Sequence, residues 1–310
     1  MSTSSTWFEG FEARDFDVGG IRVHARTGGR AAAPPLLLLH GFPQTGALWH
    51  RVAQRLAAHY SLVIPDLRGY GRSAQALPDT PDHAQHSKRA MAQDLAGLMH
   101  QLGHEFYDVC GHDRGGRVAH RLALDHPQAV RRLALIDIAP TLDMYEAADQ
   151  HFASLYYHWF FLIQPAPHPE RMIGADPVAY LHWKLGRWGA GAPGNFREPQ
   201  ALAEYEAAFS QAQAIHGACE DYRASFGIDL EHDRAARAAG HQIACDTLLW
   251  WGERGVVHAL FQPLALWQAQ CAGTVSGTAL PAGHYIPEEL PDDTARWLLD
   301  FFMPPVPLPA

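Results

Sequence analysis

Residues 111–115 read Gly-His-Asp-Arg-Gly and stand between an apolar stretch at 106–110 and a helical stretch at 117–124. A strand that leads through G-x-nucleophile-x-G into a helix is typical of a sharp turn that presents a catalytic side chain at the carboxyl end of a sheet. The two glycines favour such a turn because it brings backbone segments close together. The central residue is Asp113, so the pattern predicts a carboxylate that attacks alkyl carbon to form an ester, which water then cleaves.

Strands and helices alternate on both sides of this turn. Short apolar runs predict strands that are buried on both faces, and apolar residues at helical spacing predict a helix over 88–102. The expected strands are a hairpin at 11–26 and runs at 36–39, 61–65, 106–110, 133–136, 247–251 and 274–280, with a final helix at 291–302. This alternation predicts an α/β fold with a mostly parallel sheet and helices on both faces.

A helical block interrupts the alternation. From about residue 140 to 235 the chain is rich in aromatic residues and has no convincing strand pattern. We therefore expect an α/β core made of residues 1–139 and 236–310, with an inserted helical cap at 140–235 that covers the catalytic edge of the sheet.

Bulk composition limits the class of protein. A chain of 310 residues is long enough for one large domain. Its net charge of −9 argues against nucleic acid or an anionic membrane surface as a partner, and no apolar run approaches the ~20 residues of a membrane span. The four cysteines are scattered without metal-ligand spacing, which favours free thiols in a reducing cytoplasm.

Two more loops are expected at the same edge of the sheet. His-Gly-Phe-Pro at 40–43 directly follows the strand at 36–39. In this arrangement the backbone amides of Phe42 and of Arg114, the residue after the nucleophile, would form an oxyanion hole. His284 follows the last strand and takes the position expected of the general base.

The acid that orients His284 has two candidate positions. Hydrolases of this kind often carry it after the penultimate strand, but there the sequence reads Trp-Gly-Glu-Arg-Gly at 251–255, with Gly255 in the usual place of the acid. The other position, after the strand at 133–136, is occupied by Asp137. We assign the role to Asp137 and keep Glu253 as the alternative.

Two arginines flank the nucleophile in the sequence. Like charges at ~4 Å repel by roughly 4 kcal/mol at an effective dielectric near 20, so an anionic substrate beside Asp113 needs compensation. Arg114 and Arg117 are placed to supply it and to grip a carboxylate in fixed geometry. A neutral substrate would need neither arginine.

With these pieces the chain resembles the fluoroacetate dehalogenases, a branch of the α/β-hydrolase family. The resemblance covers residues 10–300 and rests on HGFPQT at 40–45, DLRGYGRS at 66–73, GHDRGGRVAHRLALDHP at 111–127, Asp137 and GHYIPEE at 283–289. It implies an α/β-hydrolase fold with a mostly parallel eight-stranded sheet and an inserted helical cap. It also implies a homodimer.

The resemblance further implies roles for residues of the cap. His158, Trp159 and Tyr222 would bind the leaving halide, and Trp188 would form a wall of the pocket. An imidazole, an indole and a phenol are suitable donors, because departing fluoride needs hydrogen bonds that strengthen as its charge develops. The expected partner is a small haloacid, and the expected reaction uses neither a metal nor an organic cofactor.

Three other functions remain open at this stage. An epoxide hydrolase shares the Asp–His–Asp machinery and would protonate its substrate with cap tyrosines, for which Tyr156, Tyr157 and Tyr222 are available. A haloalkane dehalogenase commonly has an asparagine and a tryptophan where this chain has Phe42 and Arg114. A catalytically silent binding protein would not need the set Asp113, Asp137 and His284.

Overall fold

The apolar runs of the sequence form a sheet that is buried on both faces in the computed structural model, which describes residues 7–188 and 198–303. In β3 (Pro35–Leu39), Leu37 and Leu39 join one apolar cluster, while Leu36 and Leu38 join the cluster on the opposite face. This alternation follows from the pleat, because successive side chains of a strand point to opposite faces.

The sheet contains eight strands in the order β1-β2-β4-β3-β5-β6-β7-β8. Besides β3, the strands are β1 (Phe11–Val18), β2 (Ile21–Gly29), β4 (Ser61–Pro65), β5 (Tyr107–His112), β6 (Val130–Ile136), β7 (Asp246–Gly252) and β8 (Val275–Leu280). Strand β2 is antiparallel to both of its neighbours, and all other pairs are parallel. The predicted mostly parallel eight-stranded sheet is confirmed.

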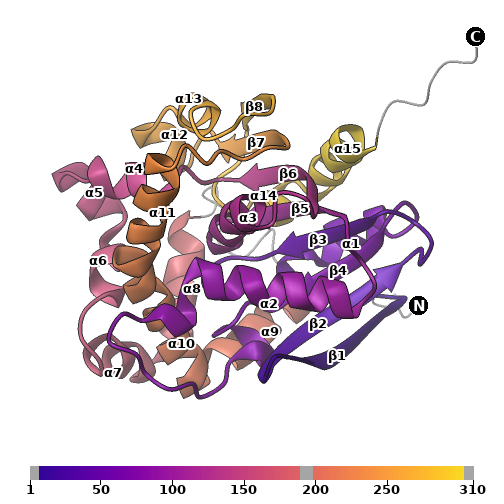
Figure 1. Ribbon diagram of the computed structural model, residues 1–310. Helices are drawn as coiled ribbons and strands as arrows, with labels where there is room; N and C mark the ends of the chain where they lie inside the picture. Colours follow the sequence, from indigo (N-terminus) through magenta and orange to yellow (C-terminus); the bar gives the residue numbers. More distant parts are fainter. Residues whose placement is uncertain (1–6, 189–197, 304–310) are drawn as a thin grey trace, which may run out of the picture.

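Helices of the core cover both faces of this sheet (Figure 1). The apolar residues of α2 (Lys88–Gln101) and α3 (Arg114–Asp125) belong to one cluster, and those of α1 (His50–Leu56) and α15 (Pro291–Phe302) to the other. Three short helices complete the core, namely α12 (Val256–Leu260), α13 (Pro263–Gln268) and α14 (Ile286–Glu289).

Between β6 and β7 the described chain forms helices and no strand. These helices are α4 (Thr141–Glu146), α5 (Gln150–Leu155), α6 (Tyr157–Leu162), α7 (His168–Gly174), α8 (Pro177–Trp188), α9 (Pro199–Phe209), α10 (Ala212–Phe226) and α11 (Ile228–Ala238). They gather on one side of the molecule in Figure 1, and their apolar residues are continuous with the α2/α3 cluster. We propose this segment as the cap; the limit expected at residue 235 falls within α11.

Within the described ranges, no helix is both long and apolar enough to cross a membrane.

Candidate active site

The backbone turns sharply at Asp113, between β5 and α3. Asp113 has φ 49° and ψ −116°, a conformation that non-glycine residues rarely adopt. A Cβ atom on Gly111 would lie 2.5 Å from the carbonyl oxygen of Gly115, and one on Gly115 would lie 2.3 Å from that of His40. Both flanking positions therefore require glycine, as the sequence pattern predicted.

The loop at 40–43 lies directly against this turn. The Phe42 amide donates a 2.9 Å hydrogen bond to Asp113 Oδ1. The ring of His40 fixes the loop, because its Nε2 accepts a hydrogen bond from the Leu67 amide at 2.9 Å. The Phe42 amide thus reaches the carboxylate of Asp113. The role of the Phe42 and Arg114 amides as an oxyanion hole stays a proposal. For Arg114 this proposal is based on its position at the start of α3.

His284 bridges two carboxylates. Its Nδ1 lies 2.5 Å from Asp137 Oδ2 and its Nε2 lies 3.9 Å from Asp113 Oδ2. Asp137 Oδ1 also accepts a 2.9 Å hydrogen bond from the Gly252 amide, which fixes the orientation of this carboxylate. With the shared proton assigned to Nδ1, the Nε2 lone pair faces the ester that Asp113 would form.

Electrostatics sets the protonation states of this group. Burial raises the pKa of Asp113, but the positive charges of His284, His112, Arg117 and Arg114 outweigh burial and bring it below its ordinary value. Burial lowers the pKa of His284, yet its hydrogen bond to Asp137 and the charges of Asp137 and Asp113 raise it above its ordinary value of 6.5. Asp113 is thus an ionised nucleophile, and His284 has enhanced basicity.

The structure also explains why either of two positions in the sequence can carry the acid. A Cβ atom on Gly255 would lie 3.3 Å from Asp137 Oδ1, so a carboxylate carried at position 255 would occupy the same region. Glu253, the alternative, is exposed, and its amide donates to the Leu280 carbonyl. Of these residues, Asp137 is the one whose carboxylate reaches His284.

Arg114 is fully buried and bound to a residue of the cap. Its Nε and Nη2 bind the carboxylate of Asp221 at 2.7 and 2.8 Å, and its guanidinium stacks on the Tyr222 ring at 4.1 Å from the centroid. Nη2 also donates to Ser225 Oγ at 2.5 Å. Nη1 has no hydrogen-bond acceptor in the described part of the chain. We propose it as the donor for a substrate.

Arg117 is also held in place by hydrogen bonds and by an aromatic ring. Its Nη1 donates to the Ala139 carbonyl at 3.1 Å and to Thr141 Oγ1 at 2.8 Å. Its guanidinium lies 4.8 Å from the centroid of the Trp159 ring. Its Nε is buried without an acceptor among the described residues. Each arginine thus keeps one unused donor, as a carboxylate-binding role requires.

A small cavity lies at Asp113 and His284, and neither Arg114 nor Arg117 is among the residues that line it. It has a volume of about 10 Å³ and is lined by Phe42, Asp113, His158, Lys184, Trp188, Tyr222, His284 and Tyr285. Of the expected halide-binding residues, His158 and Tyr222 face the cavity, while Trp159 lies behind Tyr222 at 6.4 Å between ring centroids. Trp188 packs against His158 and His284 at 5.2 and 5.1 Å.

Sequence reasoning missed two residues of this group. Asp221 pairs with Arg114, and Lys184 brings a buried ammonium to the cavity. A buried arginine requires an acid partner, which predicts that a residue like Asp221 exists but not where it lies. Among the described residues, no group of three or more His, Cys, Asp and Glu side chains is arranged to hold a metal ion.

Comparisons with known proteins identify the family of this chain and similar proteins. The model of the α/β-hydrolase fold family matches residues 34–290. Fluoroacetate dehalogenase from Burkholderia sp. is 47% identical over 95% of this chain and 94% of its own length. Soluble epoxide hydrolase from Corynebacterium sp. (strain C12) is 30% identical over 93% of this chain and 96% of its own.

A solved structure is also similar to this chain. The crystal structure of an α/β hydrolase from Nostoc sp. PCC 7120 is 48% identical to this chain and superposes with a TM-score of 0.91. The match covers 96% of this chain and 99% of the other.

Proposed function

The chain belongs to the α/β-hydrolase fold family, and from that premise we propose that it removes halide hydrolytically from short haloacids, with fluoroacetate as a substrate. The proposal combines the similarity to fluoroacetate dehalogenase at 47% identity with the residues around Asp113. The product would be the corresponding hydroxy acid, for fluoroacetate glycolate.

The first step is displacement at the carbon that carries the halogen. The donors left free on Arg114 and Arg117 hold the substrate carboxylate and cancel its repulsion from Asp113. A carboxylate oxygen of Asp113 forms a bond to carbon with its own electron pair, while the carbon–halogen bond breaks and halide leaves with the bonding pair. His158 and Tyr222, which line the cavity, receive the halide.

The second step hydrolyses the ester. His284 Nε2 takes a proton from water, and the resulting hydroxide attacks the Asp113 carbonyl carbon. The amides of Phe42 and Arg114 stabilise the oxyanion. The intermediate collapses by expelling the glycolate oxygen, which takes the proton from His284. Asp137 holds the imidazole throughout.

One observation carries the assignment, namely two buried guanidinium groups beside the nucleophile, each with an unused donor. An epoxide is neutral and requires no such pair, so the arrangement favours a haloacid over an epoxide. The cavity of about 10 Å³ also favours a very short substrate.

Fluoride release tests the proposal. Purified protein is incubated with fluoroacetate at neutral pH, and free fluoride is measured with an ion-selective electrode. We expect release by the wild type and none by Asp113→Asn, which removes the nucleophilic charge but keeps the shape of the side chain. Turnover of styrene oxide without fluoride release would instead identify an epoxide hydrolase, and full activity of Asp113→Asn would exclude the mechanism.

Two finer assignments belong to the same proposal. We place the enzyme in the cytoplasm, because all four cysteines are free thiols.

We also propose a homodimer, for which the exposed Met172, Val178 and Trp183 of α7 and α8 offer an apolar contact surface. Light scattering on the eluting protein distinguishes monomer from dimer.

A further inference from the structure

Lys184 is a buried lysine that has no role in the two proposed steps. It lies on cap helix α8, its exposed fraction is 2%, and it lines the cavity that contains Asp113 and His158. Its Nζ has no hydrogen-bond acceptor within the described ranges and lies 4.5 Å from the centroid of the Trp188 ring. A buried ammonium in this state is unfavourable for folding, so its presence points to a ligand.

The other lysine of the chain shows how such a charge is usually accommodated. The sequence contains only two lysines, Lys88 and Lys184. Lys88 is also buried, but it is paired with Asp221 and Asp229 and bonded to Ser225. No carboxylate forms an ion pair with Lys184 among the described residues.

The protonation of Lys184 fits a group that waits for an anion. Burial is the largest cause that lowers the pKa of its ammonium. The charge of Asp113 raises this pKa and the charge of Arg187 lowers it, and the resulting pKa is about 7. An anion placed beside Nζ would favour the charged form again.

The position of Lys184 indicates which part of the substrate it meets. Arg114 lies under Tyr222 and Arg117 lies under Trp159. The ring contacts of Nζ are different, at 4.5 Å from Trp188, 5.7 Å from Tyr157 and 5.9 Å from Phe42. His158 joins this group, because its ring packs against both Phe42 and Trp188. Lys184 therefore lies on the side of the cavity that contains His158, and its ring contacts do not include Tyr222 or Trp159, although the His158 ring also contacts Tyr222 at 5.6 Å.

We propose that Lys184 is a catalytic residue that contacts the departing halide beside His158. This inference rests on the proposed function. In the displacement step the halide leaves with the electron pair of the carbon–halogen bond, and the Lys184 ammonium balances its new negative charge without transferring a proton. Burial and the charge of Lys184 hold the pKa of His158 far below 6.5, so His158 donates as a neutral imidazole. In its protonated form Lys184 then adds a positive charge beside His158.

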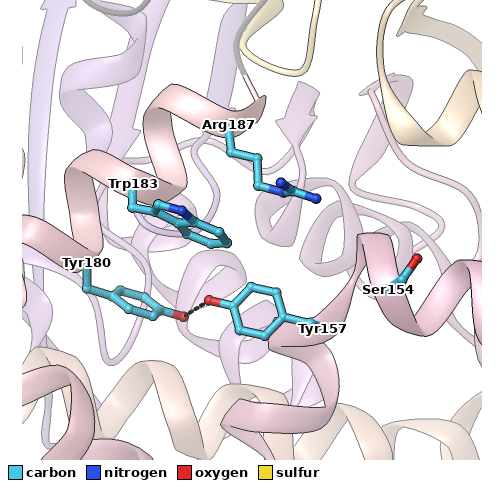
Figure 2. Close-up of a pocket in the computed structure, with 5 residues that line it drawn as sticks. All are labelled: Ser154, Tyr157, Tyr180, Trp183 and Arg187. Atoms are coloured by element: carbon cyan, nitrogen blue, oxygen red, sulfur yellow. Dashed lines mark hydrogen bonds between the residues drawn. The ribbon is translucent and has the colours of Figure 1, made fainter.

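A larger cavity outside the site lies close to the same lysine. It has a volume of about 470 Å³ and is lined by Ser154, Tyr157, Tyr180, Trp183 and Arg187 (Figure 2). Tyr157, hydrogen-bonded to Tyr180 at 3.4 Å, belongs to this outer cavity and also lies beside Lys184 Nζ. A halide held at Lys184 would be one aromatic ring away from a route to solvent.

The test compares Lys184→Met with Arg171→Met, which removes a charge from an exposed position on the neighbouring cap helix α7. The kcat values for fluoroacetate and bromoacetate are measured for each variant, with bromide binding by titration calorimetry and the melting temperature. Fluoride is the poorer leaving group and concentrates its charge more. We therefore expect Lys184→Met to lose about 10²-fold in kcat for fluoroacetate and less than about tenfold for bromoacetate.

The other two measurements exclude a structural role. Lys184→Met should bind bromide more weakly than the wild type and should melt a few degrees higher, because an unpaired buried charge has been removed. Arg171→Met should match the wild type in the fluoroacetate-to-bromoacetate ratio and in bromide affinity.

An unchanged ratio together with unchanged bromide affinity in Lys184→Met would overturn the inference, as would an equal loss on both substrates accompanied by a lower melting temperature. A wild type that releases halide from neither substrate would remove the proposed function. In that case the bromide affinities alone would test the role of Lys184. Equal affinities of the wild type and Lys184→Met, or no binding by either protein, would count against that role.

Discussion

Asp221 on cap helix α10 holds the guanidinium of Arg114 on core helix α3 through two parallel hydrogen bonds of 2.7 and 2.8 Å. Both side chains are completely buried. Burial raises the pKa of Asp221, but the charges of Arg114 and Lys88 lower it well below its ordinary value. The proposed cap thereby orients Arg114, the core residue for which we propose substrate binding, so on this proposal substrate binding depends on how the two parts of the chain meet.

Substitution Asp221→Asn should weaken substrate binding. Loss of the charge leaves Arg114 and Lys88 without their shared partner, and breaking a buried pair of this kind costs about 3–5 kcal/mol of stability. Because Arg114 loses its fixed orientation, we expect KM for haloacids to rise by about tenfold or more. Steady-state kinetics and urea unfolding measure the two effects.

Asp233→Asn is the matched control for Asp221→Asn. Asp233 on α11 also pairs with an arginine of α3, Arg121, at 2.5 Å, and both side chains are buried. This variant should lose stability while its KM stays near the wild-type value. If Asp221→Asn lost only stability as well, Asp221 would have no role in orienting the clamp.

Replacing His284 should separate the two chemical steps. In His284→Gln, Asp113 can still displace halide, but no base activates water against the ester. We expect a burst of one halide per site and a stable adduct that carries one carboxymethyl group on Asp113. Intact-protein and peptide mass spectrometry detect the adduct. Continued turnover without an adduct would argue against a covalent intermediate.

The pH dependence of turnover should reflect the pair His284–Asp137. His284 works as a base only when neutral, and its pKa is raised above 6.5. The kcat should therefore rise with increasing pH, with an apparent pKa above 6.5. Asp113 does not add to this limb, because its pKa is lowered.

The variant Asp137→Asn tests the cause of this pH dependence. It removes the charge of Asp137 and leaves at most a neutral hydrogen bond to His284. Both changes lower the pKa of His284, so the limb should move to lower pH while the plateau falls. A limb that stayed in place would show that another group controls the pH dependence.

Trp188 should control the size of the acid. Its ring lies 5.2 Å from that of His158 and 5.1 Å from that of His284, and it lines a cavity of only about 10 Å³. Trp188→Ala should raise kcat/KM for 2-chloropropionate relative to chloroacetate by about tenfold, since one methyl group changes such ratios by 10–200-fold. Trp183→Ala, which truncates an exposed ring of the same helix, should leave the ratio unchanged.

The sequence by itself determined the elements that have local or repeating signals. The run at 36–39 is apolar because its strand is buried on both faces, and Gly111 and Gly115 are required by a turn that leaves no room for a Cβ atom. Patterns of this kind depend on neighbours in the chain, so the strands, the turn at Asp113 and the place of His284 after the last strand could be predicted without coordinates.

Only the tertiary structure decided which distant side chains meet. Asp221 is 107 positions from Arg114, and no spacing rule connects them. From the sequence alone, Lys184 could be an ordinary surface residue of an amphipathic helix. Its burial in the cavity that contains Asp113 depends on how α8 packs in the folded chain. The acid behaves in the same way, because Asp137 and a residue at 255 converge on one place only after β6 and β7 pair. Charges in a buried site are balanced by neighbours in space, and a sequence specifies those neighbours only through the fold.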